Sequence, residues 1–160
     1  MPLNFEKHAQ KGNKFLKELA EKLGDKADTA KAGCLLRAVF QALRNHLTLE
    51  ENFQLLSQLP IALKGVYVHG WIPSKKQEIS RKKIDFIEEV LKYADGTSLH
   101  SVSDIEKGTK EVHTILKTLK QYISQGEFKD MEAVLPRQLK KLLRESLYNK
   151  TLTINLIPEK

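Results

Sequence analysis

The chain has little of several features that mark common protein classes. It holds one cysteine, Cys34, so no disulfide can form within it. No apolar run approaches the roughly 20 residues that a membrane-spanning helix needs, and the N-terminus lacks the apolar segment of a secretion signal. These absences exclude a disulfide-stabilised scaffold, speak against a membrane partner and predict a cytoplasmic protein.

Motifs of the commonest enzyme classes are also missing. The sequence has no phosphate-binding glycine loop, no dinucleotide-binding glycine pattern, no paired-histidine zinc motif and no nucleophile elbow. No two histidines lie four residues apart, the spacing that would hold a metal on one helix face. We therefore predict no catalytic, cofactor-binding or metal-binding residues, and a protein that is not an enzyme. The five histidines are His8, His46, His69, His100 and His113, the last expected to be partly buried.

What the chain does have is an ordinary globular composition with an excess of positive charge. Its 160 residues are 41% hydrophobic and 29% charged, with a net charge of +7. The excess lies mainly in segment 75–83 and on the last predicted helix, where Arg137, Lys140, Lys141 and Arg144 recur at the spacing of one helix face. Two interpretations stay open: a solvated linker and helix face, or a surface that binds nucleic acid.

Apolar residues at helical spacing predict a first helix from about Asn4 to Leu23. Phe5 and Ala9 belong to its apolar stripe. Gly24 follows where a C-terminal cap belongs.

Three more helices are predicted in the first half. Asp28 offers an N-cap to the second helix, whose apolar stripe includes Cys34 as a small core residue. Thr48 and Glu51 have the spacing of a capping box and begin the third helix. Pro60 starts a short fourth helix, because proline suits a first turn better than a helix interior.

Segment 65–71 has the most distinctive local composition. Gly65 falls inside the predicted fourth helix, where glycine costs about 1 kcal/mol relative to alanine, so we expect a neighbouring helix to approach closely there. Tyr67 and Trp71 either form an aromatic patch that recognises a partner or plug the end of the helical bundle.

The second half repeats this pattern. Ser124 and Glu127 have the same capping spacing, a second Leu-Pro pair follows at 135–136, and Ser103 and Glu106 are expected to open the helix before them. We interpret the chain as one domain, 1–160, in which two similar four-helix repeats, 4–73 and 81–149, are joined by a linker at 74–80.

The tail, 150–160, has a different pattern. Leu152, Ile154 and Leu156 alternate with polar residues, which predicts an extended arm. The arm either lies over the helical body or docks on a partner or a second copy, which would give self-association.

Two runs resemble a known family. They are AVFQALRNHLTLEENFQLLSQLPIALKGVYVHGW and ILKTLKQYISQGEFKDMEAVLPRQLKKLL, and they are similar to the prokaryotic domain of unknown function 2267. The resemblance extends from about Phe5 to Leu143. It implies a soluble, bacterial, all-helical protein, and it supplies no catalytic residue.

The sequence therefore predicts an all-α bundle of about eight helices with an extended C-terminal tail. The predicted function is that of a non-enzymatic protein-interaction module. The alternative is nucleic-acid binding through the basic last helix and segment 75–83.

Overall fold

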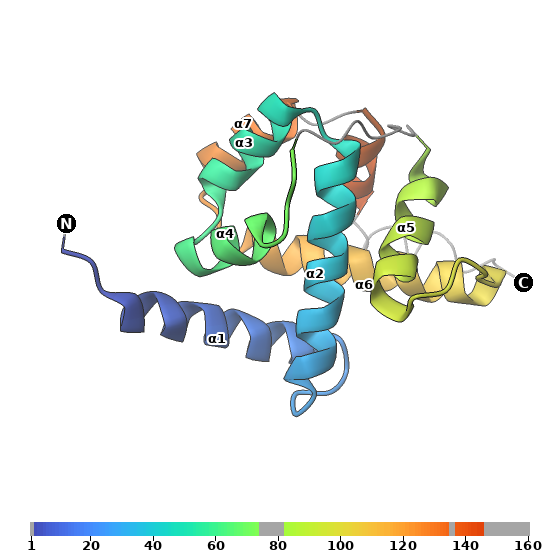
Figure 1. Cartoon of the computed structure of the whole chain (residues 1–160), viewed down its shortest axis with the longest axis horizontal. Helices are drawn as coiled ribbons and strands as arrows, with labels where there is room; N and C mark the ends of the chain where they lie inside the picture. Colours follow the sequence, from blue (N-terminus) through green and yellow to red (C-terminus); the bar gives the residue numbers. More distant parts are fainter. Residues whose placement is uncertain (1, 74–81, 135–136, 146–160) are drawn as a thin grey trace, which may run out of the picture.

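Helices form all the regular secondary structure of the residues described, which are 2–73, 82–134 and 137–145 of a computed structural model (Figure 1). The all-α prediction is confirmed. The predicted linker, the Leu-Pro pair at 135–136 and the tail lie outside the described residues. The helices are α1 (Phe5–Lys22), α2 (Thr29–His46), α3 (Leu49–Gln58), α4 (Ile61–Val68), α5 (Lys83–Asp95), α6 (Val102–Lys120), α7 (Gln125–Val134) and a last helical segment, 137–145.

Side-chain caps begin the first three helices. Asp28 and Thr48 are the predicted caps, and Asn4 caps α1, where the sequence predicted only the start of the helix. The side chain of Asn4 accepts a hydrogen bond from the third residue of α1, and that of Asp28 does the same for α2. At α3, Thr48 and Glu51 form both bonds of the capping box, at 3.2 and 2.9 Å. Polar side chains thus satisfy N–H groups that have no partner within the helix.

The predicted start of α6 is wrong by two residues. The capping box is formed by Ser101 and Asp104, with bonds of 2.9 and 3.1 Å. Ser103 and Glu106, the predicted pair, lie exposed within the first turns of the helix. Both pairs have the three-residue spacing. The upstream pair caps the helix because the N–H groups without a partner are those of its first turn, which begins at Val102.

Substitution of the two serines distinguishes the caps. Ser101→Ala should lower the free energy of unfolding by about 1 kcal/mol, because α6 loses its side-chain acceptor. Ser103→Ala, two residues further on, should change it by less than about 0.5 kcal/mol. Urea unfolding followed by circular dichroism measures both values. Equal losses would contradict the observed cap.

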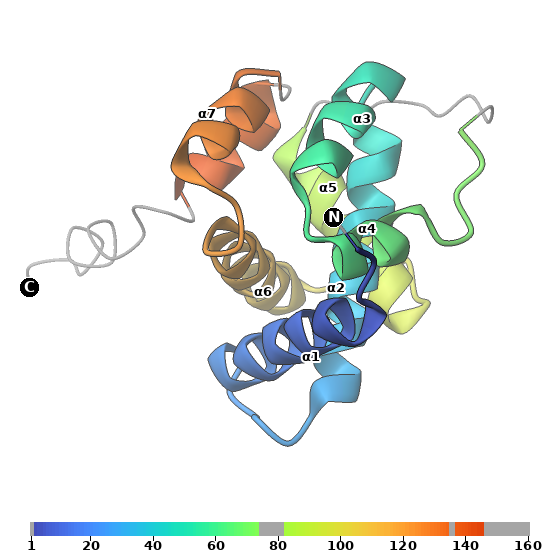
Figure 2. The same ribbon diagram turned by 90° about the vertical axis from the view of Figure 1, so that its left-hand side faces the viewer.

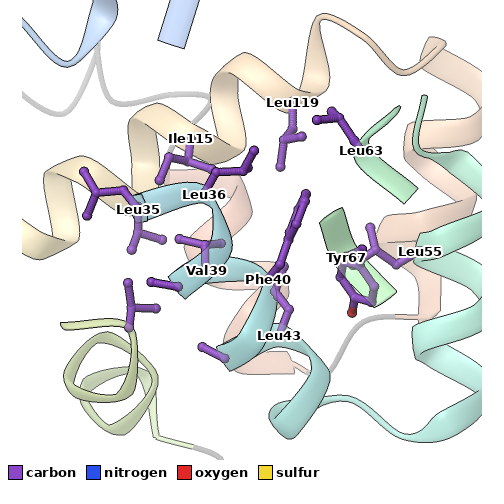
Figure 3. Close-up of a cluster of buried hydrophobic side chains, with 14 of the residues drawn as sticks. Leu35, Leu36, Val39, Phe40, Leu43, Leu55, Leu63, Tyr67, Ile115 and Leu119 are labelled. Carbon is purple, nitrogen blue, oxygen red and sulfur yellow. The ribbon is translucent and has the colours of Figure 1, made fainter. Parts of the chain in front are cut away.

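The core is built around α2, which contacts α1, α4, α5 and α6. Residues on several sides of α2 are buried, so the helix is covered from more than one direction. Figure 3 shows its side chains facing Leu55 of α3, Leu63 and Tyr67 of α4, and Ile115 and Leu119 of α6. The labelled core residues are Leu35, Leu36, Val39, Phe40, Leu43, Leu55, Leu63, Tyr67, Ile115 and Leu119.

The N-terminal half of α1 departs from the prediction. Phe5 and Ala9 were expected in the core, yet Phe5 is 75% exposed and Ala9 is exposed as well. The buried residues of this helix are Phe15, Leu19 and Ala20. The reason is that α1 extends past the helical body at its N-terminal end, so only its later turns meet the core (Figure 1).

The two halves of the chain meet where α5 packs along α2. Near the end of α2, His46 Nε2 lies 2.5 Å from Glu89 Oε2, and Asn45 Nδ2 donates to Glu89 Oε1 at 2.6 Å. Burial alone would raise the pKa of Glu89, but the hydrogen bonds from His46 and Asn45 outweigh burial and hold this pKa below its ordinary value. A charged Glu89 therefore links α5 to the end of α2.

The order of helix lengths is the same in both halves: two longer helices followed by two short ones. Ser124 and Glu127 form the predicted reciprocal hydrogen bonds at the start of α7, at 3.4 and 3.3 Å. The short helices α3 and α7 lie side by side (Figure 2). Duplication of one four-helix unit stays a prediction.

The close helix approach predicted at Gly65 is found elsewhere. In the described part of the chain, no atom of another helix lies within 4 Å of the position that a Cβ would take at Gly65. At Gly12 of α1, by contrast, a Cβ would lie 2.9 Å from the Cβ of Ala62 in α4. Glycine is therefore needed at residue 12, where the backbones of α1 and α4 meet, and not at residue 65 for internal packing.

Candidate functional site

Large apolar side chains gather on the surface beside the ends of α3 and α4. Phe53 is 56% exposed, and its ring centroid lies 6.4 Å from that of the half-buried Trp71. Leu49, one turn before Phe53 on α3, and Ile72, next to Trp71, are exposed too. We call these four residues, Leu49, Phe53, Trp71 and Ile72, the aromatic surface.

Trp71 is placed by the way α4 ends. The guanidinium of Arg44, from α2, donates to the carbonyl oxygens of Tyr67 at 3.1 Å and His69 at 2.9 Å. Gly70 then takes a left-handed conformation, with φ of 70°, and the N–H of Trp71 donates to the carbonyl of Val68. Arg44 thus fixes the carbonyl groups at the end of α4, and the tight turn after it brings the indole against α3.

A buried polar pair stands behind the aromatic surface. The hydroxyl of Tyr67, whose side chain is fully buried, donates to Asn52 Oδ1 at 2.5 Å. Burial raises the pKa of Tyr67 far above its ordinary value, and the charge of Arg44 opposes this only in part, so the phenol stays neutral. The amide of Asn52 donates in turn to the carbonyls of Arg44, Leu47 and Thr48, at 3.2, 3.1 and 3.0 Å.

The structure therefore separates the two aromatic residues singled out in the sequence. Tyr67 lies inside, where its ring packs edge-on against Phe40 and Trp71, and it does not reach the surface. Trp71 lies at the boundary between core and solvent. Of the two alternatives, the position of Tyr67 fits a residue that plugs the end of the helical bundle. The recognition role of Trp71 stays a prediction.

Three residues of this region were not found from the sequence: Arg44, Asn52 and Phe53. A signal for Asn52 is present, because it lies three and seven residues before Leu55 and Leu59 on the apolar stripe of α3. A polar residue on a buried stripe needs hydrogen-bond partners. Its fully buried side chain finds them at the corner between α2 and α3.

Arg44, Asn52 and Tyr67 form the polar frame behind the aromatic surface. Loss of the Arg44 donors should weaken this frame. Arg44→Met should lower the free energy of unfolding by about 1 to 3 kcal/mol and shift the emission of Trp71, the only tryptophan, to longer wavelength. Arg37→Met, on the same helix, should change stability by less than about 0.5 kcal/mol, since Arg37 is exposed. Urea unfolding and tryptophan fluorescence measure both effects. Unchanged stability and emission in Arg44→Met would contradict the role assigned to this arginine.

The basic residues predicted on the last helix lie on segment 137–145. Arg137, Lys141 and Arg144 are exposed and Lys140 is half-buried. Arg144 Nε donates to Glu132 Oε1 of α7 at 2.6 Å, so an acidic group lies against this face. The apolar side of the segment is buried, as predicted, through Leu139, Leu142 and Leu143.

Titratable residues elsewhere gather in small structural groups. His113 is buried on α6, 3.9 Å from the carboxylate of Glu145, which Lys83 approaches to 2.5 Å. Cys34 is half-buried and its thiol lies 3.5 Å from the carbonyl of Ala94. No group of three or more histidine, cysteine, aspartate or glutamate side chains that could hold a metal occurs in the part of the chain that the structure describes.

Acid should destabilise the protein through His113. Burial, and then the positive charge of Lys83, lower the pKa of His113, while Glu145 raises it by less. The unfolded chain therefore takes up a proton before the folded chain does, and stability falls as the pH drops below about 6.5. His113→Gln should show a smaller loss of unfolding free energy between about pH 7.5 and 5.5, measured by urea unfolding at each pH. A loss as large as that of the wild type would contradict this assignment.

These features define an all-helical protein that displays an aromatic surface on a polar frame. The model of one family, described as "Uncharacterized conserved protein (DUF2267)", matches residues 12–142, and the chain belongs to this family. The family prediction made from the sequence is confirmed. No curated protein matches the chain. None of the helices in the described ranges is both long and apolar enough to span a membrane.

Proposed function

We propose that the chain is a non-enzymatic, cytoplasmic protein-interaction module that binds its partner through the aromatic surface. The observation that carries this proposal is the exposure of Phe53 beside Trp71. Contiguous apolar side chains at a surface are typical of protein contact sites, and aromatic residues contribute strongly to their binding energy.

The frame behind this surface supports the same proposal. Arg44, Asn52 and Tyr67 hold the end of α4 and the start of α3 through hydrogen bonds of 2.5 to 3.2 Å. A partner that meets a surface already in place loses less conformational entropy on binding. Phe53 and Trp71 therefore suit the role of anchors.

The alternative, nucleic-acid binding through the basic last helix, has weaker support. Arg144 is paired with Glu132, and Lys140 is half-buried. Only Arg137 and Lys141 of the four predicted residues are then exposed without an acidic partner among the described residues. The helix also buries its leucine side in the core.

Two exposed residues permit a matched test. Phe53→Ser should abolish recovery of a specific partner in affinity capture from the native cell, because the exposed anchor is lost. Leu99→Ser, at a residue that is 88% exposed in the loop before α6, should leave that recovery unchanged. The free energy of unfolding of both variants should lie within about 0.5 kcal/mol of the wild-type value, since each replaces a side chain that is mostly exposed to solvent.

Equal recovery with Phe53→Ser would contradict the proposal. A captured partner that is removed by nuclease treatment, and lost in the double variant Arg137→Glu, Lys141→Glu, would favour the nucleic-acid alternative instead. Such binding would also weaken steeply with added salt.

A further inference from the structure

A groove lies between α1, α2 and α4. Its volume is about 530 Å³, which is within the range of pockets that bind small molecules. Leu16, Leu36, Leu63 and Val66 give it an apolar lining from all three helices. The contact between Gly12 and Ala62 brings α1 and α4 together at one part of its wall.

Two helix-interior glycines that border the groove, Gly33 and Gly65, make no close packing contact with the described residues. Among the side chains and helices that the structure describes, a Cβ at Gly65 would have no neighbour within 4 Å, and one at Gly33 would meet only the tip of Leu16, at 3.9 Å. Glycine weakens a helix relative to alanine. Because close packing does not require glycine at these two positions, we attribute both to the hollow itself, which a side chain at either position would fill.

The charge of the groove has one sign. Arg37 lines it, and no aspartate or glutamate does. Arg37 makes no ion pair or side-chain hydrogen bond with any residue in the described ranges. Asn13, Gln41 and His69 supply further polar groups. A guanidinium beside an apolar hollow matches a ligand with an apolar body and one carboxylate, because the planar N–H donors of arginine bind a carboxylate through two parallel hydrogen bonds.

We propose that this groove binds a free aliphatic carboxylate, of the fatty-acid class, with the chain along Leu16, Leu36 and Val66 and the carboxylate on Arg37. A second copy of the protein suits the groove less well. The protruding end of α1, which carries the exposed Phe5, holds two lysines, Lys7 and Lys11, against one carboxylate, Glu6, so its net charge has the same sign as Arg37. The inference is independent of the aromatic surface, because none of Leu49, Phe53, Trp71 and Ile72 lines the groove.

The test uses the full chain and a fluorescent probe, dansyl-labelled undecanoic acid, displaced by monomeric sodium laurate. The wild type should bind one laurate per chain, and lauryl alcohol, which lacks the carboxylate, should compete at least about tenfold less well. Arg37→Gln should weaken laurate binding about tenfold and leave competition by the alcohol unchanged. Arg137→Gln, at an exposed arginine on segment 137–145, should bind laurate as the wild type does.

A second pair of variants tests the hollow. Gly65→Leu should abolish laurate binding while melting at or above the temperature of the wild type, because leucine fills the groove and favours a helix. Gly126→Leu, at a helical glycine of α7 that also has open space around it, should leave binding unchanged. If Gly65→Leu does not fold, Arg37→Gln and the alcohol competition still decide the question.

Several results would overturn the inference. These are no saturable binding of laurate, equal binding of laurate and its alcohol, undiminished binding by Arg37→Gln or by folded Gly65→Leu, and binding to phosphatidylglycerol vesicles without binding of monomeric laurate. The last result would assign the surface to a membrane. Phe53→Ser should bind laurate as the wild type does, so this test and the partner test can fail separately.

Discussion

The whole structure depends on the burial of one helix from several sides. α2 has nine buried residues out of 18, and they include residues as close in sequence as Ala38, Val39 and Phe40, which point in different directions. A single neighbouring helix could not cover them all. The helices of the first half cover α2 in part, and α5 and α6 from the second half complete the cover. The two halves therefore bury a shared core, as expected for units too small to hold a large core alone.

The end of α2 connects this core to the surface. An α-helix leaves its last four carbonyl groups without partners inside the helix, and here Asn52 takes up two of them while the side chain of Arg44 serves the end of α4. The same short stretch of chain thus satisfies the ends of two helices. Because α4 is only eight residues long, these hydrogen bonds contribute a large share of what fixes its position. The exposed ring of Phe53 and the half-buried ring of Trp71 lie next to this arrangement.

Local chemistry made most of the helices predictable. Asp28 and Thr48 cap the helices that the sequence assigns to them, since the capping bond involves only residues a few positions apart. The errors arose where a residue's role depends on distant parts of the chain. Phe5 has the spacing of a core residue, but none of the described helices covers it. At Ser103 two equivalent local patterns overlapped, and spacing alone could not rank them.

The candidate site was predictable only in part, for the same reason. Trp71 stood out by composition, whereas Phe53 joins it through the turn after α4, which no local pattern specifies. Tyr67 and Trp71 looked alike in the sequence, and only the position of Asn52 shows that the tyrosine belongs to the core.

Gly12 and Gly65 show how one residue type serves opposite purposes on facing helices. At Gly12 the absence of a side chain lets α1 and α4 touch, and at Gly65 it leaves space that no other part of the described chain occupies. Gly12 contributes to the stability of the fold, whereas Gly65 lowers it. Such a loss of stability is common where a residue serves binding instead of packing. A hollow of this kind binds a ligand well only if its walls keep their positions. Arg44 meets that requirement, because it holds the carbonyl of His69, whose side chain lines the groove, with the same guanidinium that holds the carbonyl of Tyr67 behind the aromatic surface. Arg44, which is half-buried, therefore stabilises the end of α4, on which both proposed binding surfaces depend.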